Sequence, residues 1–216
     1  MLDNFNILNG QMYAAADPLL GQSIATPTGT FGPGGIAGRV GDLLITNNKF
    51  DRVILVTFCI GGTGVGTWSV PAGINSPLGN NATVAMARLA QAGITPGQTG
   101  VTFAALWMQG ESDGATSQSA YTNSFATISA QLIATGFNGR IFVNEQTWLS
   151  GVTTAAVQNA QIAIPNSLTP GTWAGANADS LGAGSRQSDN THFTAAGLAS
   201  LSTLIVAAMA ASGAPF

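Results

Sequence analysis

The single histidine of this 216-residue chain, His192, is the residue best suited to acid–base chemistry near neutral pH. It follows Asp189 by three positions, just ahead of an apolar segment with helical spacing. In serine hydrolases a carboxylate holds the base histidine through its second ring nitrogen, so this spacing indicates a catalytic pair. The same spacing also fits a capping turn, in which Asp189 accepts backbone amides and His192 is merely exposed. Because the chain offers no other imidazole, we favour the catalytic pair.

A glycine-rich turn, 61–64, follows the apolar run 53–60. Glycine adopts backbone conformations that other residues avoid, and it lets a main-chain N–H face a substrate oxygen. Gly62 is therefore a candidate donor to an oxyanion. The alternatives are an ordinary turn after a strand and a phosphate-binding loop, but no lysine follows at the spacing that a phosphate-binding loop requires.

A polar motif, Trp-Met-Gln-Gly-Glu-Ser-Asp, occupies residues 107–113 after a second apolar run. The side-chain amide of Gln109 could donate a hydrogen bond to a developing oxyanion. Glu111 is one of only two glutamates in the chain, and we expect it to accept hydrogen bonds from the loop amides that shape the site. The other glutamate, Glu145, raises the alternative of a glycosidase carboxylate pair, which we disfavour because it leaves His192 without a role.

The apolar pattern predicts which elements position these side chains. Strands are predicted over 52–60, 101–108 and 140–144, and helices over 39–47, 81–92, 117–135, 153–164 and 194–211, with Thr194 as the N-cap of the last. Residues 1–38 are rich in Gly, Pro, Asn and Thr and predict mostly loop. Alternating strands and helices indicate one α/β domain, 1–216, with a mostly parallel sheet. Ligands bind such sheets beyond the carboxyl ends of the strands, where the polar clusters would converge.

Composition excludes several classes of partner. Six basic and nine acidic residues give a net charge of −3 without any cluster of Lys or Arg, so nucleic acid is not an expected partner. No apolar run is long enough for a membrane span, and the start of the chain shows no signal peptide, although the weakly charged surface suits a secreted protein. The one cysteine, Cys59, cannot form an internal disulfide and is predicted to be buried in a strand. We expect no metal and no other cofactor, and the oligomeric state is open.

Three motifs in this order resemble the SGNH-hydrolase superfamily, and most closely its branch of sialate O-acetylesterase-like carbohydrate esterases. They are Gly61-Gly62-Thr63 with Trp68 nearby, the Gln-Gly-Glu-Ser motif within 107–113, and Asp189-Asn190-Thr191-His192-Phe193 followed by Gly197. The resemblance implies a three-layer α/β/α flavodoxin-like fold and metal-free hydrolysis of acetyl esters on sugars. It also implies His192 as the base, Asp189 as its orienting partner, and Gly62 and Gln109 as oxyanion donors.

The nucleophile departs from the family pattern. In the family a Gly-Gln-Ser-Asn or Gly-Asp-Ser block ends the first strand, and no such strand and block is visible upstream of Asn4. Gly21-Gln22-Ser23 reproduces the first three letters, but it follows an Asp-Pro-Leu-Leu segment that normally lies after the block. Either Ser23 acts as the nucleophile from an unusual loop, or the chain begins after the block and lacks a central strand. Ser112 is a weaker candidate because it belongs to the Gln-Gly-Glu loop.

The sequence therefore predicts a serine esterase that removes acetyl groups from carbohydrate. One alternative is a non-catalytic carbohydrate-binding or structural module that kept the fold and lost its nucleophile. Another is a general lipase or thioesterase of the same superfamily, which would prefer longer acyl chains. The expected partner is an acetylated carbohydrate or another small ester, with no nucleic acid and no membrane.

Overall fold

The computed structural model describes residues 1–17, 19, 35–71, 77–167 and 171–213. The chain divides into two compact units, which we call the terminal unit (Met1–Gly61 with Ser180–Phe216) and the central unit (Gly62–Asp179). The single domain predicted over 1–216 stays a prediction. In the described part of the chain, no helix has the length and apolar character needed to cross a membrane.

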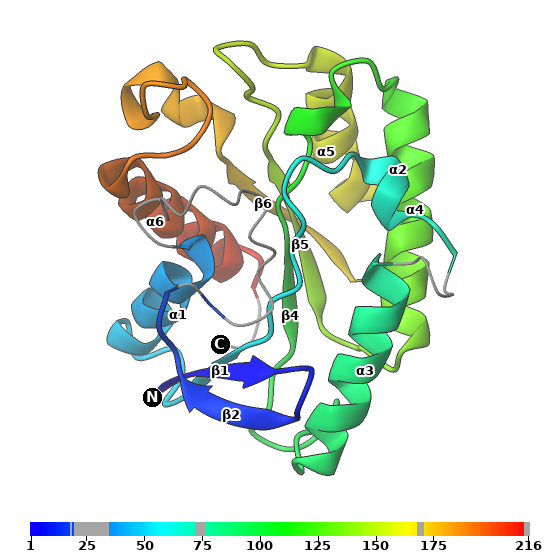
Figure 1. Ribbon diagram of the computed structural model, residues 1–216, viewed down its shortest axis with the longest axis vertical. Helices are drawn as coiled ribbons and strands as arrows, with labels where there is room; N and C mark the ends of the chain where they lie inside the picture. The colour runs from blue at the N-terminus through cyan, green and yellow to red at the C-terminus, as the bar shows by residue number, and fades with distance from the viewer. Residues whose placement is uncertain (18, 20–34, 72–76, 168–170, 214–216) are drawn as a thin grey trace. The chain divides into compact units, whose positions relative to one another are not determined.

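The terminal unit combines three short strands with two helices. Its elements are β1 (Leu2–Asn6), β2 (Gln11–Ala14), α1 (Ile36–Thr46), β3 (Val53–Leu55), the 3₁₀ turn η3 (Ala183–Ser185) and α6 (Ala195–Ala211). Strand β1 pairs antiparallel with β2 and parallel with β3. Helix α1 packs against α6, beside which it lies in Figure 1, and against β3. Leu44 of α1 is buried in the core, as the amphipathic spacing of that helix requires, and so is Leu201 of α6, which is apolar on most sides.

Strands β1 and β2 correct the prediction that residues 1–38 are mostly loop. The sequence of β1 has no continuous apolar run because it contains Asp3 and Asn4, and so it does not predict a strand. Both residues are nevertheless buried. The Arg52 guanidinium donates to Asp3 Oδ2 at 2.6 Å, and Asn4 Nδ2 donates to the main-chain oxygen of Leu55 at 3.1 Å. Because these partners replace water, two polar residues can be buried in a strand.

Strand β3 is shorter than the strand predicted over 52–60. Its parallel pairing with β1 ends at the pair Asn4 and Leu55. Cys59 lies beyond that point and is exposed, so the prediction of a buried strand cysteine is wrong. The apolar run therefore predicts a strand that is too long, because an apolar pattern does not show where pairing with the neighbouring strand ends.

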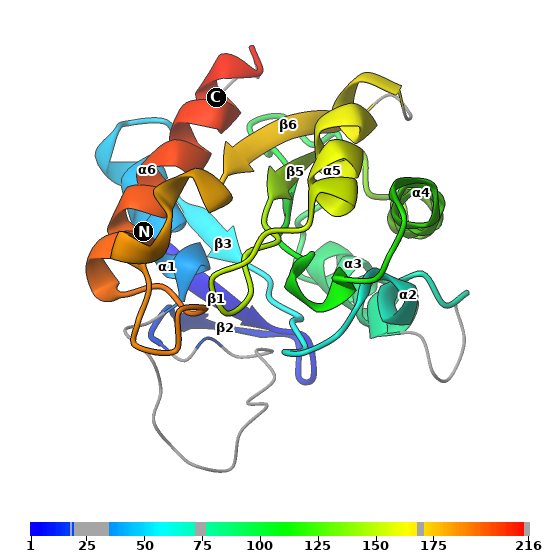
Figure 2. The ribbon, with the colours of Figure 1, turned by 90° about the horizontal axis from the view of Figure 1, so that it is seen from above.

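The central unit holds a parallel sheet in the order β4-β5-β6. Its elements are α2 (Val65–Trp68), α3 (Pro77–Gln91), β4 (Ala104–Trp107), η1 (Glu111–Asp113), α4 (Gln118–Ala134), β5 (Arg140–Glu145), α5 (Ala155–Ser167) and β6 (Thr172–Asn177). The 3₁₀ turn η2 (Asp179–Leu181) begins at the last residue of this unit. Helix α5 packs on β5 and β6, and α4 packs on α5, so both helices lie on the same side of this sheet (Figure 2).

The predicted helices are confirmed with ends shifted by a few residues, and so are the predicted strands over 101–108 and 140–144. Sequence reasoning missed β6 because its sequence, Thr-Trp-Ala-Gly-Ala-Asn, has no apolar run. The strand forms by extending the sheet beside β5, whose residues Ile141, Phe142 and Val143 are buried. Because β4, β5 and β6 run parallel, the loops that follow them lie at the same edge of the sheet. Ligands bind at this edge in folds of this kind.

Candidate active site

Asp189 and His192 lie in the loop between η3 and α6, within the terminal unit. Asp189 Oδ2 lies 2.6 Å from His192 Nδ1, so an ionised carboxylate places the ring proton on Nδ1 and leaves Nε2 to act as a base. The other carboxylate oxygen accepts the main-chain N–H groups of Thr191 at 2.9 Å and of His192 at 3.0 Å. Asp189 thus forms both the capping turn and the contact with the imidazole, each through a different carboxylate oxygen.

The charge of Asp189 is fixed by the same contacts. Hydrogen bonding to the His192 ring, helped by the Thr191 amide, lowers the pKa of Asp189 to about 2. The carboxylate is therefore ionised at neutral pH, as an orienting partner must be. The His192 side chain is 75 % exposed, which leaves its ring accessible to a substrate.

Neighbouring residues fix the shape of this loop. The Arg186 guanidinium donates to the main-chain oxygen of Thr191 at 2.8 Å and lies 3.6 Å from the centre of the Phe193 ring. Thr194 is the N-cap of α6, as predicted, and its hydroxyl accepts the N–H of Gly197 at 3.0 Å. His192 is therefore held two residues ahead of Thr194, the cap of α6, which limits the movement of its backbone.

Gly62 lies in the turn before α2, within the central unit, and its φ is +72°. Asp113 holds the end of this turn, because the N–H of Val65 donates to both of its carboxylate oxygens at 3.0 and 3.2 Å. The Thr116 hydroxyl donates to the same carboxylate at 2.9 Å. Asp113 is only 5 % exposed, so these donors replace the water that the carboxylate loses on folding.

Gln109 follows β4, and both ends of its buried side-chain amide have partners. Its Nε2 donates to the Asp113 carboxylate and, at 3.2 Å, to the main-chain oxygen of Thr63. Its Oε1 accepts from the Tyr121 hydroxyl at 3.1 Å. An amide NH₂ has two hydrogens, and both therefore have acceptors within the unit. To donate to a substrate, Gln109 must exchange one of these acceptors.

Tyr121 and Gln161 form a buried polar cluster around the main chain of Gln109. The Tyr121 hydroxyl lies 2.9 Å from the main-chain oxygen of Gln109 and accepts Trp107 Nε1 at 3.1 Å. Gln161 Nε2 donates to the same oxygen of Gln109 at 2.7 Å, and Gln161 Oε1 accepts the N–H of Gln146 at 3.1 Å. Gln161 thus ties the loop after β4 to the loop after β5. Burial raises the pKa of Tyr121 to about 12, so its hydroxyl keeps its proton.

Gly110 lies at a close approach between these two loops. Its φ is +154°, and a Cβ at this position would lie 2.3 Å from the main-chain oxygen of Gln146 and 2.7 Å from Gln161 Nε2. Only glycine combines that backbone conformation with that approach. The glycine of the Gln-Gly-Glu motif is therefore explained by packing between the loops.

Two aspartates that the sequence analysis did not select anchor the loops of this unit. The acceptance of loop amides, which was expected of Glu111, is seen at Asp113, whereas Glu111 accepts the side-chain amide of Gln146. Asp179, after β6, accepts the main-chain N–H of Thr147 at 2.9 Å. The last letter of the Gln-Gly-Glu-Ser-Asp motif could have pointed to Asp113, and the stretch Asp179-Ser180-Leu181-Gly182, which also resembles the family, could have pointed to Asp179.

Glu145, the other glutamate, lies at the end of β5 and accepts Asn177 Nδ2 at 2.7 Å. Burial, together with the charge of Asp179, raises the pKa of Glu145 above its ordinary value. Each of the two glutamates thus has an amide partner in the central unit. These partners give both carboxylates a local structural role.

Ser23 lies outside the described residues. No strand is visible in the sequence near the start of the chain, but the structure has β1 there, parallel to β3. The residues after β1 include Gly10-Gln11-Met12, and no serine precedes Ser23. The first two letters of the family's nucleophile block therefore follow β1, with methionine where the block has serine.

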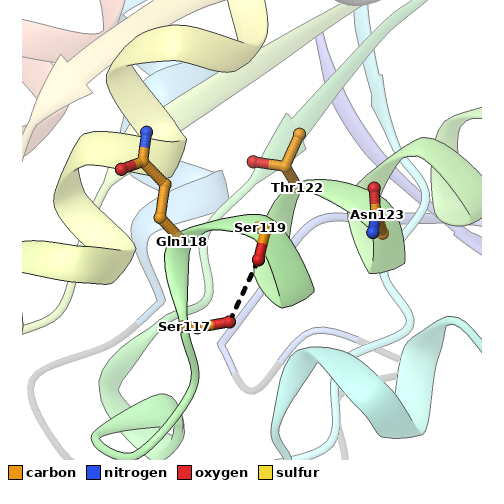
Figure 3. A pocket seen from close by; sticks show the side chains of 5 residues that line it. All are labelled: Ser117, Gln118, Ser119, Thr122 and Asn123. Carbon is orange, nitrogen blue, oxygen red and sulfur yellow. Dashed lines mark hydrogen bonds between the residues drawn. The ribbon is translucent and has the colours of Figure 1, made fainter.

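Within the described ranges, no three His, Cys, Asp or Glu side chains gather closely enough to hold a metal ion. An open hollow of about 530 Å³ borders the start of α4 and is lined by uncharged side chains of Ser117, Gln118, Ser119, Thr122 and Asn123 (Figure 3). Ser117 Oγ lies 3.3 Å from Ser119 Oγ and also accepts the N–H of Ala120 at 3.2 Å as the cap of α4. None of the described site residues lines this hollow.

The parallel strands and their helices define an α/β protein, which confirms the predicted fold class. A model of the carbohydrate esterase family of sialic acid-specific acetylesterases matches residues 7–211, and the chain belongs to that family. A protein from Arabidopsis thaliana has a similar structure, with 21% sequence identity and a TM-score of 0.63 over 97% of this chain and 80% of that one. A carbohydrate esterase family 3 protein from Talaromyces cellulolyticus has 11% identity and a TM-score of 0.54 over 81% and 90% of the two chains. No curated protein matches the chain.

Proposed function

We propose that this chain is a serine esterase that hydrolyses acetyl esters on carbohydrate. Membership of a family of carbohydrate acetylesterases supports this class of reaction. The observation that carries the chemistry is the 2.6 Å contact between Asp189 Oδ2 and His192 Nδ1. That contact sets the tautomer in which Nε2 accepts a proton.

In the proposed reaction, His192 Nε2 takes the proton of a serine hydroxyl while the serine oxygen attacks the ester carbonyl. The Asp189 carboxylate stabilises the imidazolium that forms. The tetrahedral intermediate then collapses, and His192 returns the proton to the departing sugar hydroxyl. Water hydrolyses the acetyl-serine by the same route and releases acetate. Ser23, the first serine of the chain, is the proposed nucleophile.

The proposed oxyanion donors are the Gly62 N–H and the Gln109 side-chain amide. A donor of this kind typically contributes about 3–4 kcal/mol to the stability of the transition state. The contact of Gln109 Nε2 with the main-chain oxygen of Thr63, at 3.2 Å, keeps the Gln109 amide next to the Gly62 turn. When it binds the oxyanion, Gln109 would release the Thr63 oxygen and keep its contact with the Asp113 carboxylate.

The test is acetate release from acetylated sialic acid, acetylated xylan and p-nitrophenyl acetate by the wild type and by His192→Ala. We expect the substitution to lower the rate by about 10²–10⁴-fold, because it removes the general base. Ser188→Ala, an exposed change in the same loop, is the matched control and should retain the rate. Equal rates for the wild type and His192→Ala would contradict the assignment of the base. A preference for long p-nitrophenyl esters would instead favour the lipase or thioesterase alternative.

A second candidate function is a carbohydrate-binding module without catalytic activity. The observation that favours it is the sequence Gly10-Gln11-Met12 after β1, where the family's block would supply serine. A thioether cannot serve as a nucleophile of this type, because it has no proton for His192 to remove. Binding of acetylated glycans by a folded wild type that releases no acetate would support this candidate over the esterase.

A further inference from the structure

The two proposed oxyanion donors are linked through one buried carboxylate. Asp113 accepts the N–H of Val65, at the end of the Gly62 turn, and it also accepts Gln109 Nε2. The link is tight, since a Cβ built on Gly64 would lie only 3.2 Å from Asp113 Oδ1. Movement of this carboxylate would therefore displace both the turn and the amide.

We propose that Asp113 is a positioning residue that fixes the Gly62 turn and the Gln109 amide relative to each other. This inference rests on the proposed function, because it gives Asp113 a role in catalysis only through those two donors. Asp113 does not itself touch the substrate. Preorganised donors stabilise an oxyanion only when their geometry is set before the reaction, which a buried and fully bonded carboxylate achieves.

The chain supplies a matched comparison in Asp179. It is 7 % exposed, whereas Asp113 is 5 % exposed, and it also accepts loop amides, from Thr147 at 2.9 Å and Trp148 at 3.0 Å. These amides belong to the loop after β5, and Gln158 Nε2, which also donates to Asp179 at 2.9 Å, belongs to α5. General loosening of the unit should therefore follow from a change at either aspartate, whereas loss of donor geometry should follow only from a change at Asp113.

Asp113→Asn keeps the shape of the side chain and replaces one acceptor oxygen by an NH₂ group. Three donors, Val65 N, Gln109 Nε2 and Thr116 Oγ1, then face a single acceptor oxygen. Hydrogen exchange of the peptide covering 62–68 should become at least about tenfold faster in Asp113→Asn and should stay as in the wild type in Asp179→Asn. Unchanged exchange in Asp113→Asn, or an equal increase in both variants, would overturn the proposal.

Kinetics test the catalytic part separately. Asp113→Asn should lower kcat for p-nitrophenyl acetate by about 10–100-fold with KM within about twofold, and Asp179→Asn should retain kcat. Faster exchange at 62–68 with an unchanged kcat would overturn the role of Asp113 in catalysis. If the wild type releases no acetate, the proposed function fails, and the role of Asp113 in catalysis falls with it. The exchange measurement still decides whether Asp113 holds the turn.

Discussion

Removal of one buried hydroxyl, by Tyr121→Phe, tests the polar cluster around Gln109. Tyr121 is 0 % exposed, and its oxygen accepts Trp107 Nε1 at 3.1 Å and contacts Gln109 Oε1 at 3.1 Å. Phenylalanine fills the same volume but leaves both groups without this partner. An unsatisfied buried polar group costs about 1–3 kcal/mol, so we expect the free energy of unfolding at pH 7 to fall by about 2–4 kcal/mol.

The same hydroxyl makes stability depend on pH in the alkaline range. Burial raises the pKa of Tyr121 from 10.0 to about 12, so the folded protein binds this proton more tightly than the unfolded chain does. The resulting stabilisation is fully present below pH 10 and is lost as the pH rises toward 12. At pH 11 the loss is about 1.4 kcal/mol relative to pH 8, since one pKa unit corresponds to about 1.4 kcal/mol.

Urea unfolding followed by tryptophan fluorescence at pH 8, 9, 10 and 11 measures this difference. The chain suits the experiment because it contains only two tyrosines, one cysteine and one lysine. The wild type should lose about 1.4 kcal/mol more than Tyr121→Phe between pH 8 and pH 11. Tyr13→Phe is the control, because Tyr13 is 44% exposed. An identical pH dependence of Tyr121→Phe and the wild type would refute the buried, protonated hydroxyl.

Two further substitutions test the loops. Gly110→Ala should lower the free energy of unfolding by about 2–4 kcal/mol, because its Cβ would lie 2.3 Å from the main-chain oxygen of Gln146. Gly114→Ala should be nearly neutral, and equal melting temperatures of the two variants would contradict the close approach of the loops. Asp189→Asn should lower kcat/KM by about 10²–10⁴-fold with little change in melting temperature, and a retained kcat/KM would exclude Asp189 as the orienting partner. Because the pKa of Asp189 is about 2, protonation of this carboxylate should not contribute to the activity profile above about pH 4.

The elements with a strong local pattern could be predicted from the sequence. Helix α6 begins at the predicted cap, Thr194, because a hydroxyl that accepts an N–H of the first turn is a local interaction. The contact of Asp189 with His192 is local too, since three residues separate the two side chains. Strands β1 and β6 could not be predicted, because their burial depends on partners elsewhere in the chain rather than on an apolar pattern.

The support of Gln109 could not be predicted, because it depends on contacts between distant residues. Tyr121 and Gln161 reach Gln109 from two different helices, and neither belongs to a motif. Asp113 lies inside the Gln-Gly-Glu-Ser-Asp motif, yet its partner Val65 is 48 positions away in the sequence. Sequence reasoning therefore reached the residues that could do chemistry but not the buried groups that hold them.

The central claim is that His192 activates a serine nucleophile, and a fluorophosphonate probe tests it most directly. The measurement is the site of covalent labelling, mapped by mass spectrometry of peptides from the folded wild type, His192→Ala and Ser23→Ala. The account predicts one label on Ser23 in the wild type and none in either variant. Labelling that persists in His192→Ala, or a folded wild type that carries no label on any serine, would contradict it.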